Sequence, residues 1–361
     1  MDTSATEHEK EVQSFMGRVS NISMSGILSL AVAIGKQLNI FEVLGELSSE
    51  ENPVTAEIVA EKAGLKERYV REWLASMACA DFIEVTPDGE KFWISSVKKA
   101  VLCGASNEAF EMTMFMQQFA PIYKTMTQVF RKDGPKGTTY EQYDNFITQF
   151  SNMSNGVYQK HLIPDLVPLT GVSEALVTGI EVLDVGCGNG FIVNHLAENF
   201  PASSFVGIDN FAEAVDNARE AGHPNSSFLR HDAAHLPAEW DNRFDWVTIF
   251  DACHDQCRPD LSLKEVYRVL KPGGIFSMVE IKGTSNVYED KKEGDLAAVL
   301  YTISLFHCLP IGYNSEDALG LGTKWGEKRA RDLLQQAGFK TVEVINLSFC
   351  GNVLYKCRKE P

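Results

Sequence analysis

Apolar residues follow two different patterns along this chain, and the change falls near residue 178. Before that point they recur at helical spacing, as in Glu67–Ala80, where one face carries Tyr69, Val70, Trp73, Leu74 and Met77. After it, short apolar runs alternate with helical stretches, which is typical of repeated strand and helix units in a mostly parallel sheet. The runs that predict strands are Glu181–Val185, Phe205–Asp209, Ser227–Arg230, Trp246–Phe250, Ile275–Ile281, Thr341–Asn346 and Asn352–Lys356.

The helical part contains a winged-helix pattern within residues 26–100. Its parts are, in order, a helix ending near Gly35, a short helix Thr55–Ala63, a turn at Gly64, the helix Glu67–Ala80, and two apolar segments, Phe82–Val85 and Phe92–Ile94, around Pro87-Asp88-Gly89. Those last segments flank a strong turn signal, so they predict the hairpin that forms the wing.

The length of 361 residues exceeds what one hydrophobic core usually serves, so we expect more than one structural unit. The predicted boundaries are 1–104 for the winged helix, 105–177 for a helical connector, and 178–361 for the α/β domain. The connector begins with the Met- and Phe-rich segment Phe110–Phe119. A helix that is apolar on most sides is either buried core or, at this position, the roof of a site.

Charge excludes some partners. The chain has a net charge of -16, which repels nucleic acid and anionic lipid. Residues 26–100 carry eight Lys or Arg against twelve Asp or Glu. We therefore expect the winged helix to form a homodimer rather than to bind DNA. The apolar stretch Gly26–Gly35 is too short to span a bilayer, so we expect no membrane partner and a cytoplasmic location.

The strand Val182–Val185 runs into a loop with three alternating glycines, Gly186, Gly188 and Gly190. Glycines at this spacing allow a tight turn and close approach of the backbone to a ligand, and the next helix points its free N–H groups at the same place. A dinucleotide loop has the spacing G-x-G-x-x-G instead. Asp184 at the strand end would repel a pyrophosphate but pair with an ammonium group, so the predicted ligand carries both an amine and a carboxylate.

Two more acids follow at the ends of the next strands. Asp209 is placed to accept hydrogen bonds from two vicinal ribose hydroxyls, and Asp232 to accept from an exocyclic adenine amine. Three further residues lie beside these positions or at the end of the fourth strand and complete the expected cofactor set: Asn210, Ala233 and Phe250. Together with Asp184, the acids describe adenosine joined to an amino acid.

These features resemble the class I S-adenosylmethionine-dependent methyltransferases. The resemblance rests on Val182–Gly190, Asp209, Asp232 and Leu270–Gly274, and it covers about residues 178–361. It implies a Rossmann-like sheet of seven strands with the last strand antiparallel, and S-adenosylmethionine as cofactor. Other segments resemble a subgroup with an N-terminal winged helix, often called regulator-like: Glu67–Leu74, His254-Asp255-Gln256, His307-Cys308 and Gly320–Gly326. That subgroup implies no particular acceptor.

Methyl transfer requires a positioned nucleophile and, for a hydroxyl or thiol acceptor, a base. His254 follows the fourth strand and is our preferred base, with Asp255 orienting it. His307, in the insertion after the fifth strand, is the alternative. His254, His307, Cys257 and Cys308 would also suit a soft metal, but no paired spacing supports a site, so we expect metal-free transfer.

The acceptor is expected to be a small molecule, because the Met-rich segment and the insertion with Phe306 suggest a closed apolar pocket. A thiol ionises near pH 8.5 and needs little help from a base, whereas a phenol needs more, so we lean towards a thiol over a hydroxyl. The competing hypothesis is a transcriptional regulator that senses S-adenosylmethionine and binds DNA through the winged helix.

Overall fold

The computed structural model describes residues 6–104, 108–143 and 146–361, and it divides into two compact units, residues 1–121 and 122–361. Helix α6 (Glu108–Val129) crosses this division. The predicted connector begins at residues 105–107, which lie outside the described residues, as does the side chain of Met114. Each unit is described by itself.

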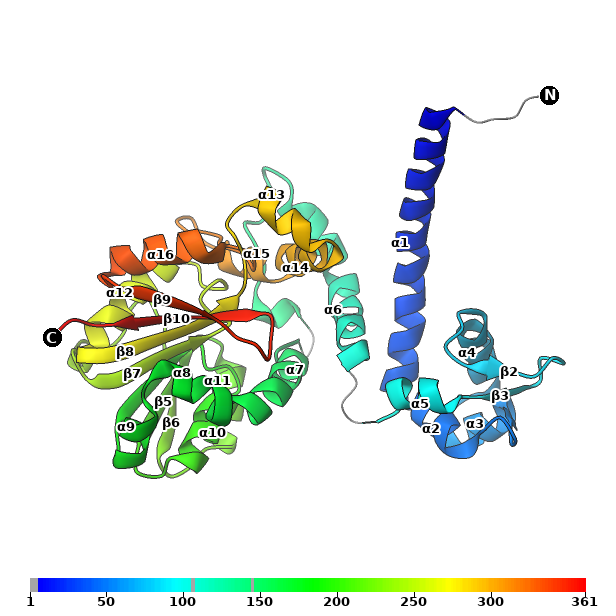
Figure 1. Ribbon diagram of the computed structural model, residues 1–361, viewed down its shortest axis with the longest axis horizontal. Helices are drawn as coiled ribbons and strands as arrows, with labels where there is room; N and C mark the ends of the chain where they lie inside the picture. Colours follow the sequence, from blue (N-terminus) through cyan, green and yellow to red (C-terminus); the bar gives the residue numbers. More distant parts are fainter. Residues whose placement is uncertain (1–5, 105–107, 144–145) are drawn as a thin grey trace. The chain divides into compact units, whose positions relative to one another are not determined.

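The N-terminal unit has the predicted winged-helix elements (Figure 1). Its helices and strands are α1 (Glu7–Gln37), α2 (Ile40–Leu47), β1 (Val54–Thr55), α3 (Ala56–Ala63), α4 (Glu67–Cys79), β2 (Glu84–Val85), β3 (Lys91–Trp93) and α5 (Ser96–Leu102). The small sheet has the order β1-β3-β2 and is antiparallel. Gly64 ends α3 with a φ of 68°, the left-handed turn that glycine favours.

The apolar face of α4 is buried inside this unit. Val70, Trp73, Leu74 and Met77 pack with α2 and α3 in one core, and the Trp73 indole N–H donates to the carbonyl of Ala31 at 2.8 Å. Burying these side chains together stabilises the unit by the usual hydrophobic contribution of about 1.5 to 3 kcal/mol for each large residue. The prediction of a homodimer also rested on this amphipathic helix, Tyr69–Met77. Its apolar face is used within the chain, except for Tyr69, which is exposed.

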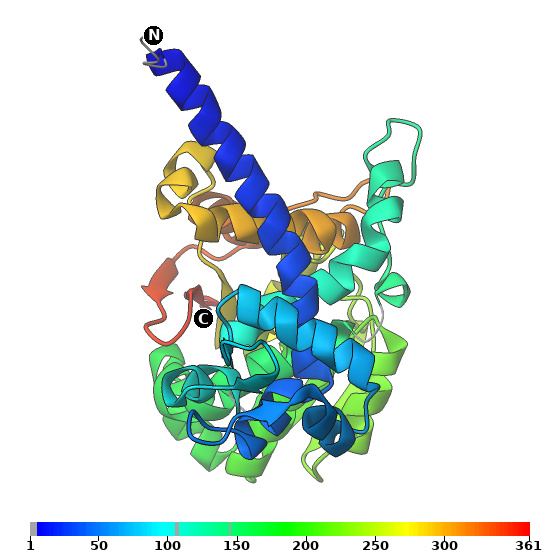
Figure 2. The same cartoon turned by 90° about the vertical axis from the view of Figure 1, so that its right-hand side faces the viewer.

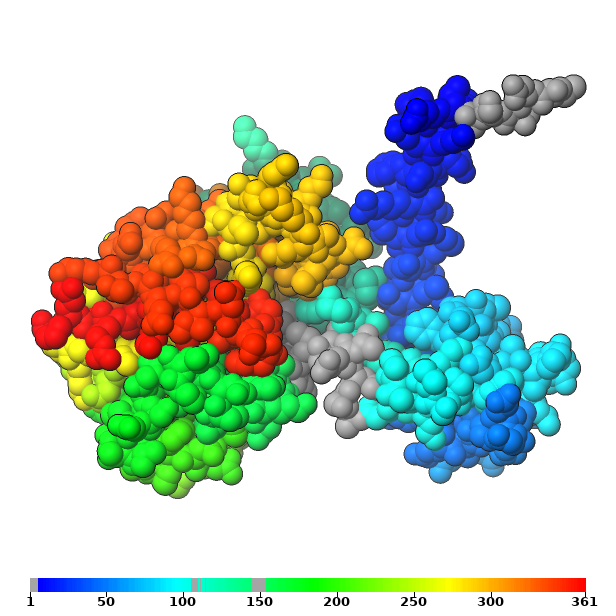
Figure 3. Space-filling view, viewed as in Figure 1, coloured from blue at the N-terminus to red at the C-terminus, as the bar shows by residue number. Residues whose placement is uncertain are grey.

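Helix α1 presents a different apolar surface. It begins at a capping box formed by Thr6 and Glu9, and it continues without a break through the apolar stretch Gly26–Gly35. Its N-terminal part stands clear of the other elements of its unit (Figures 1 and 2). The space-filling view shows the surface of this helix in dark blue (Figure 3). Large apolar side chains remain exposed along it: Val12, Phe15, Met16, Val19, Ile22, Met24, Ile27 and Ile34.

Among the described residues, α1 is a helix long and apolar enough to cross a membrane, judged by length and composition only. In this structure 17% of its 18-residue apolar stretch is buried. The stretch Gly26–Gly35 is thus part of a longer helix, and the expectation of no membrane partner stays a prediction. Apolar residues before Gly26, such as Val19 and Ile22, extend the run into one long helix.

The C-terminal unit contains a seven-stranded sheet with helices on both faces (Figure 1). Its strands are β4 (Glu181–Val185), β5 (Ser204–Asp209), β6 (Ser226–Arg230), β7 (Phe244–Phe250), β8 (Leu270–Ile281), β9 (Val342–Asn346) and β10 (Asn352–Arg358). Its helices are α7 (Phe146–His161), α8 (Val167–Thr170), α9 (Ser173–Thr178), α10 (Phe191–Asn199), α11 (Ala212–Glu220), α12 (Pro259–Val269), α13 (Val287–Asp290), α14 (Asp295–Phe306), α15 (Cys308–Gly312) and α16 (Gly326–Ala337).

The strand order is β6-β5-β4-β7-β8-β10-β9, with β4 to β8 parallel and β10 antiparallel to both neighbours. The predicted seven-stranded sheet and its antiparallel last strand are confirmed. Side chains alternate between the two faces, so Leu183 packs under α12 and α16, whereas Val182 packs under α7 to α11. The parallel strands therefore bring the carboxyl ends of β4, β5, β6 and β7 to one edge.

Candidate active site

Backbone hydrogen bonds to β5 fix the conformation of the loop between β4 and α10. The N–H groups of Gly186 and Cys187 both donate to the carbonyl of Ile208 on β5, at 2.8 and 3.0 Å. The glycines at 186, 188 and 190 have positive φ angles, which non-glycine residues rarely adopt. A Cβ on Gly188 would meet open space, whereas one on Gly190 would lie 2.7 Å from Ala218 and Phe228. Gly188 thus leaves room for a ligand, and Gly190 for core packing.

Asp209 ends β5 and joins this loop to the next one. Its carboxylate accepts from the N–H of Gly188 at 3.0 Å and from the N–H of Phe211 at 2.9 Å. Burial raises the pKa of Asp209, while these backbone hydrogen bonds oppose the rise. A carboxylate oxygen has more than one lone pair, so both oxygens retain capacity to accept from ligand hydroxyls.

Asp184 is buried at the end of β4 and accepts from the Thr248 hydroxyl at 2.7 Å. Burial raises its pKa to about 7, and the hydrogen bond from Thr248 opposes that rise. An ammonium group brought near it would favour its ionised form. Asp184 is buried and is not part of the described lining of the cavity, so its predicted pairing to an amine stays a prediction.

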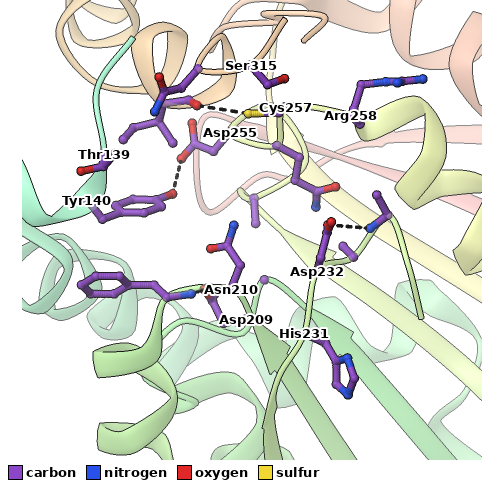
Figure 4. A pocket seen from close by; sticks show the side chains of 18 of the residues that line it. Thr139, Tyr140, Asp209, Asn210, His231, Asp232, Asp255, Cys257, Arg258 and Ser315 are labelled. Atoms are coloured by element: carbon purple, nitrogen blue, oxygen red, sulfur yellow. Dashed lines mark hydrogen bonds between the residues drawn. The ribbon is translucent and has the colours of Figure 1, made fainter. Parts of the chain in front are cut away.

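A cavity of about 700 Å³ opens at the carboxyl edge of the sheet, within the usual range for small-molecule sites. The predicted residues that line it are Gly186, Asp209, Asn210, Asp232, Ala233 and Asp255 (Figure 4). Asp232 also accepts from the N–H of Ala234 at 2.9 Å. The predicted residues that are not part of its described lining are Asp184, Gly188, Gly190, Phe250, His254 and His307. Phe250 instead packs edge to face on Tyr158.

His254 follows β7 and forms a buried pair with Glu280 on β8. Its Nδ1 lies 2.6 Å from Oε2 of Glu280, and its Nε2 lies 3.5 Å from Oδ1 of Asp255. Glu280 is held by the Trp325 indole N–H at 3.1 Å and by the backbone N–H of Cys253 at 3.0 Å. Burial opposes a charge on His254, but the carboxylates of Glu280 and Asp255 outweigh it and raise the pKa of the imidazole well above its usual value.

His307 has the opposite electrostatic surroundings. It is packed against the rings of Tyr140 and Tyr143, with centroid distances of 5.8 and 5.1 Å. Burial lowers the pKa of His307 to about 4, so its imidazole is neutral at pH 7. When the surroundings of two titratable groups shift their pKa values in opposite directions, the two groups commonly have different roles. His254 has the carboxylate partner that orients a base; His307 has an aromatic setting.

Two features of the site were missed by the sequence analysis. Glu280 was read as part of an apolar strand, although a single acid in the run Met278–Ile281 is a usable signal. Tyr140 roofs the cavity from a short 3-10 turn, Tyr140–Gln142, and its hydroxyl donates to Asp255 at 3.4 Å (Figure 4). No local pattern places Tyr140 there, because it precedes Asp255 by 115 positions.

Two parts of the chain match known families. Residues 176–338 match the family described as a methyltransferase domain, and residues 26–103 match the Rv2258c-like winged HTH domain. The phthiotriol/phenolphthiotriol dimycocerosates methyltransferase 1 of Mycobacterium ulcerans is 36% identical over 124 residues, 34% of this chain and 44% of that protein. The fatty-acid O-methyltransferase of Mycolicibacterium smegmatis is 33% identical over 118 residues, 32% of this chain and 43% of that protein. The chain spans about half the length of the curated relatives it matches.

The whole chain also has the fold of a solved methyltransferase. Human N-acetylserotonin methyltransferase, solved in complex with S-adenosylmethionine, aligns with a TM-score of 0.61 at 16% identity and covers 100% of both chains. The site fits that cofactor, since the half-buried carboxylate of Asp209 and the exposed one of Asp232 line one cavity, and Asp209 accepts from the N–H of Gly188 in the adjoining glycine loop. Residues 176–338 therefore form a methyltransferase domain and residues 26–103 an N-terminal winged-helix domain, and the fold is that of an S-adenosylmethionine-dependent methyltransferase.

Proposed function

We propose that this protein methylates a hydroxyl group of a small molecule, with His254 as the base. The observation that carries the proposal is the buried His254–Glu280 pair, 2.6 Å apart, beside a cavity that fits S-adenosylmethionine. Asp184, Asp209 and Asp232, with Asn210 and Ala233, would hold the amine, ribose and adenine of the cofactor. When bound, S-adenosylmethionine supplies an electrophilic methyl group on its sulfonium.

The residues of the chain then act on the acceptor. The Nδ1–H of a neutral His254 donates to Glu280, which fixes the ring and leaves the lone pair on Nε2. Nε2 takes the hydroxyl proton on the side where Asp255 meets the cavity, and the imidazolium that forms is stabilised by Glu280. Tyr140 covers that side and keeps water away from the reacting oxygen.

The buried His254–Glu280 pair is better explained by a hydroxyl acceptor than by a thiol acceptor. A thiol ionises close to neutral pH without help, so a base held by a fully buried carboxylate would add little to its reactivity. One similar protein is also named a fatty-acid O-methyltransferase, a name that specifies oxygen rather than sulfur as the methylated atom. We therefore place a hydroxyl ahead of the thiol favoured by sequence alone.

The test uses radiolabelled S-adenosylmethionine and matched pairs of acceptors, each pair differing only in having a hydroxyl or a thiol. Label transfer to the hydroxyl member, with a rate that depends on His254, supports the proposal. Transfer to the thiol member alone would contradict the choice of acceptor. A full-length protein that binds the cofactor, transfers no label to any acceptor and shifts duplex DNA in a salt-dependent manner would favour the regulator instead.

We also propose that the protein is a homodimer formed through its N-terminal unit. With the α4 face buried, the support now comes from α1, whose apolar side chains Phe15, Ile22 and Ile27 are each more than 60% exposed. Exposed apolar surface on this scale marks an interaction site, and a second copy offers the same surface in return.

Light scattering on Ile22→Glu/Ile27→Glu tests this dimer. The double variant should shift from dimer to monomer mass, because two charges cannot be desolvated in an apolar contact. Val97→Glu, also on an exposed position of the unit, is the matched control and should remain a dimer. A monomeric wild type would exclude the interface, as would a double variant that keeps the dimer mass.

A further inference from the structure

The loop after β7 and the start of α15 bring together three side chains with metal-binding atoms. Nε2 of His254, a carboxylate oxygen of Asp255 and Sγ of Cys308 all lie within 4.8 Å of one another. His254 and Cys308 are buried, and Asp255 lines the cavity. Cys308 has no part in the proposed methyl transfer. The sequence alone could not bring these residues together, because Cys308 lies 54 positions after His254.

The three atoms suit a zinc-class cation in type and spacing. Zinc binds nitrogen at about 2.0 to 2.1 Å, oxygen at about 2.0 to 2.2 Å and thiolate sulfur at about 2.3 Å, so tetrahedral ligand atoms stand about 3.3 to 3.6 Å apart. Nε2 of His254 is already 3.5 Å from Oδ1 of Asp255. Sγ of Cys308 lies within 4.8 Å of both atoms and has to approach them further to reach that spacing. Three protein ligands leave a fourth position, which is the pattern of catalytic rather than structural zinc sites.

The surroundings support the same interpretation. Metal-binding histidines usually donate their second ring N–H to a carboxylate, and Glu280 lies 2.6 Å from Nδ1 of His254. Oδ1 of Asp255 is buried and accepts no hydrogen bond from the described residues. Glu280 and Asp255 together concentrate negative charge at a site that also holds a thiol. A divalent cation would neutralise that charge and satisfy Oδ1 directly.

We propose that His254, Asp255 and Cys308 form a binding site for a zinc-class divalent cation, with its fourth coordination position directed to the cavity. Binding displaces one proton from the imidazolium of His254 and one from the thiol of Cys308, and both protons pass to solvent. The cation and the acceptor proton would use the same atom, Nε2. The metal therefore inhibits methyl transfer. This inhibition rests on the proposed function, whereas the binding of the metal does not.

Cobalt(II) is the probe for binding, because a cysteine thiolate bound to it gives a charge-transfer absorption in the near ultraviolet. Metal-free full-length protein should bind one Co²⁺ per chain with this absorption, and Zn²⁺ should displace it. Cys308→Ser should lose the absorption and bind at least 10-fold more weakly. Cys357→Ser, which removes another buried thiol on β10, is the matched control and should behave as wild type. Thermal unfolding of each variant checks that it folds.

If Cys308→Ser does not fold, a second variant tests the metal site. Glu280→Gln should retain the thiolate absorption but weaken Co²⁺ binding by about 10 to 100-fold, the usual effect of losing the carboxylate behind a histidine ligand. Absence of the absorption in wild type, or an unchanged absorption in a folded Cys308→Ser, would overturn the site. Equimolar Zn²⁺ should then abolish methyl transfer by wild type. Metal binding without any methyl transfer would leave the site intact and refute the proposed function alone.

Discussion

The two sides of the cavity are assembled in different ways. The cofactor side consists of Gly186, Asp209, Asn210, Asp232 and Ala233, which follow three consecutive strands within 48 positions. The proposed acceptor side has Tyr140 and Asp255 in the cavity lining, and His254, Glu280 and His307 packed against them or against each other. These five residues come from four segments spread over 168 positions. Neighbouring strand and loop units can be read in order along a sequence. A site gathered from distant segments depends on how the helices and loops pack above the sheet.

The electrostatics of the two sides also differ. The cofactor side holds carboxylates that accept from backbone N–H groups, as Asp209 does from Gly188 and Phe211. The acceptor side holds buried ionisable groups that interact with each other, as His254 does with Glu280. Variants on the first side should therefore change cofactor affinity, and variants on the second should change turnover. The predictions below test that division.

The largest effect is expected from His254→Ala. The variant should lower kcat by about 100-fold or more, because the acceptor proton loses its base, while the dissociation constant of S-adenosylmethionine changes less than twofold. Glu280→Gln should act in the same direction, since it removes the charge that stabilises the imidazolium. His223→Ala, at a histidine that is not part of the cavity lining, is the control and should keep the wild-type rate. Equal rates for His254→Ala and wild type would leave His307 or simple positioning as the explanation.

Gly188→Val should abolish measurable cofactor binding and leave the protein folded. The added side chain enters open space where we place the ligand, at the cost of strain at a φ of 51°. Gly190→Val should instead prevent folding, because its Cβ would overlap Ala218 and Phe228. Circular dichroism and calorimetry separate the two outcomes. A Gly188→Val protein that binds the cofactor normally would show that the loop does not approach the ligand closely.

Asp209→Ala should weaken S-adenosylmethionine binding by about 1 to 3 kcal/mol, the cost of leaving ligand hydroxyls and the N–H of Gly188 without an acceptor. At saturating cofactor, kcat should remain near that of wild type. Calorimetry measures the affinity, and Asp216→Ala on the exposed face of α11 serves as the matched control. A dissociation constant equal to that of wild type would remove Asp209 from the cofactor side.

The smallest effect concerns pH and distinguishes the acceptors. The pKa of His254 is raised, so the imidazole is protonated at neutral pH and the rate should increase with pH above the ordinary histidine value of about 6.5, by up to tenfold per unit. For a thiol acceptor, wild type and His254→Ala should converge at high pH, since the substrate ionises itself. For a hydroxyl they should stay apart. A rate that levels off below pH 6 would argue against a protonated His254.

The same charge pair has a consequence for stability. Because the folded-state pKa of His254 lies above its unfolded value, its contribution is complete below the unfolded pKa and is lost as pH rises through the folded one. His254→Ala should therefore remove a stability difference that is present near pH 6 and fades in alkaline solution. Thermal unfolding at several pH values measures this.

Much of the fold was determined by the sequence alone. The seven strands, the antiparallel last strand and the winged helix followed from local spacing of apolar and turn residues, because strand alternation, helix periodicity and glycine turns are set within a few residues of each other. The placement of Asp209 and Asp232 at one cavity followed as well, since parallel strands bring their carboxyl ends to one edge of the sheet. The binding of the cofactor by these residues stays a prediction.

Tertiary structure alone decided the rest. It buried the α4 face within its own unit and left α1 exposed, because both helices carry apolar faces and only packing selects which one is covered. It brought Glu280 into contact with His254, and it placed the Tyr140 hydroxyl within hydrogen-bond distance of Asp255. It also gave the two histidines different surroundings, so the pKa of His254 is raised and that of His307 is lowered. Such properties depend on burial and on neighbours distant in the chain, which local sequence patterns do not encode.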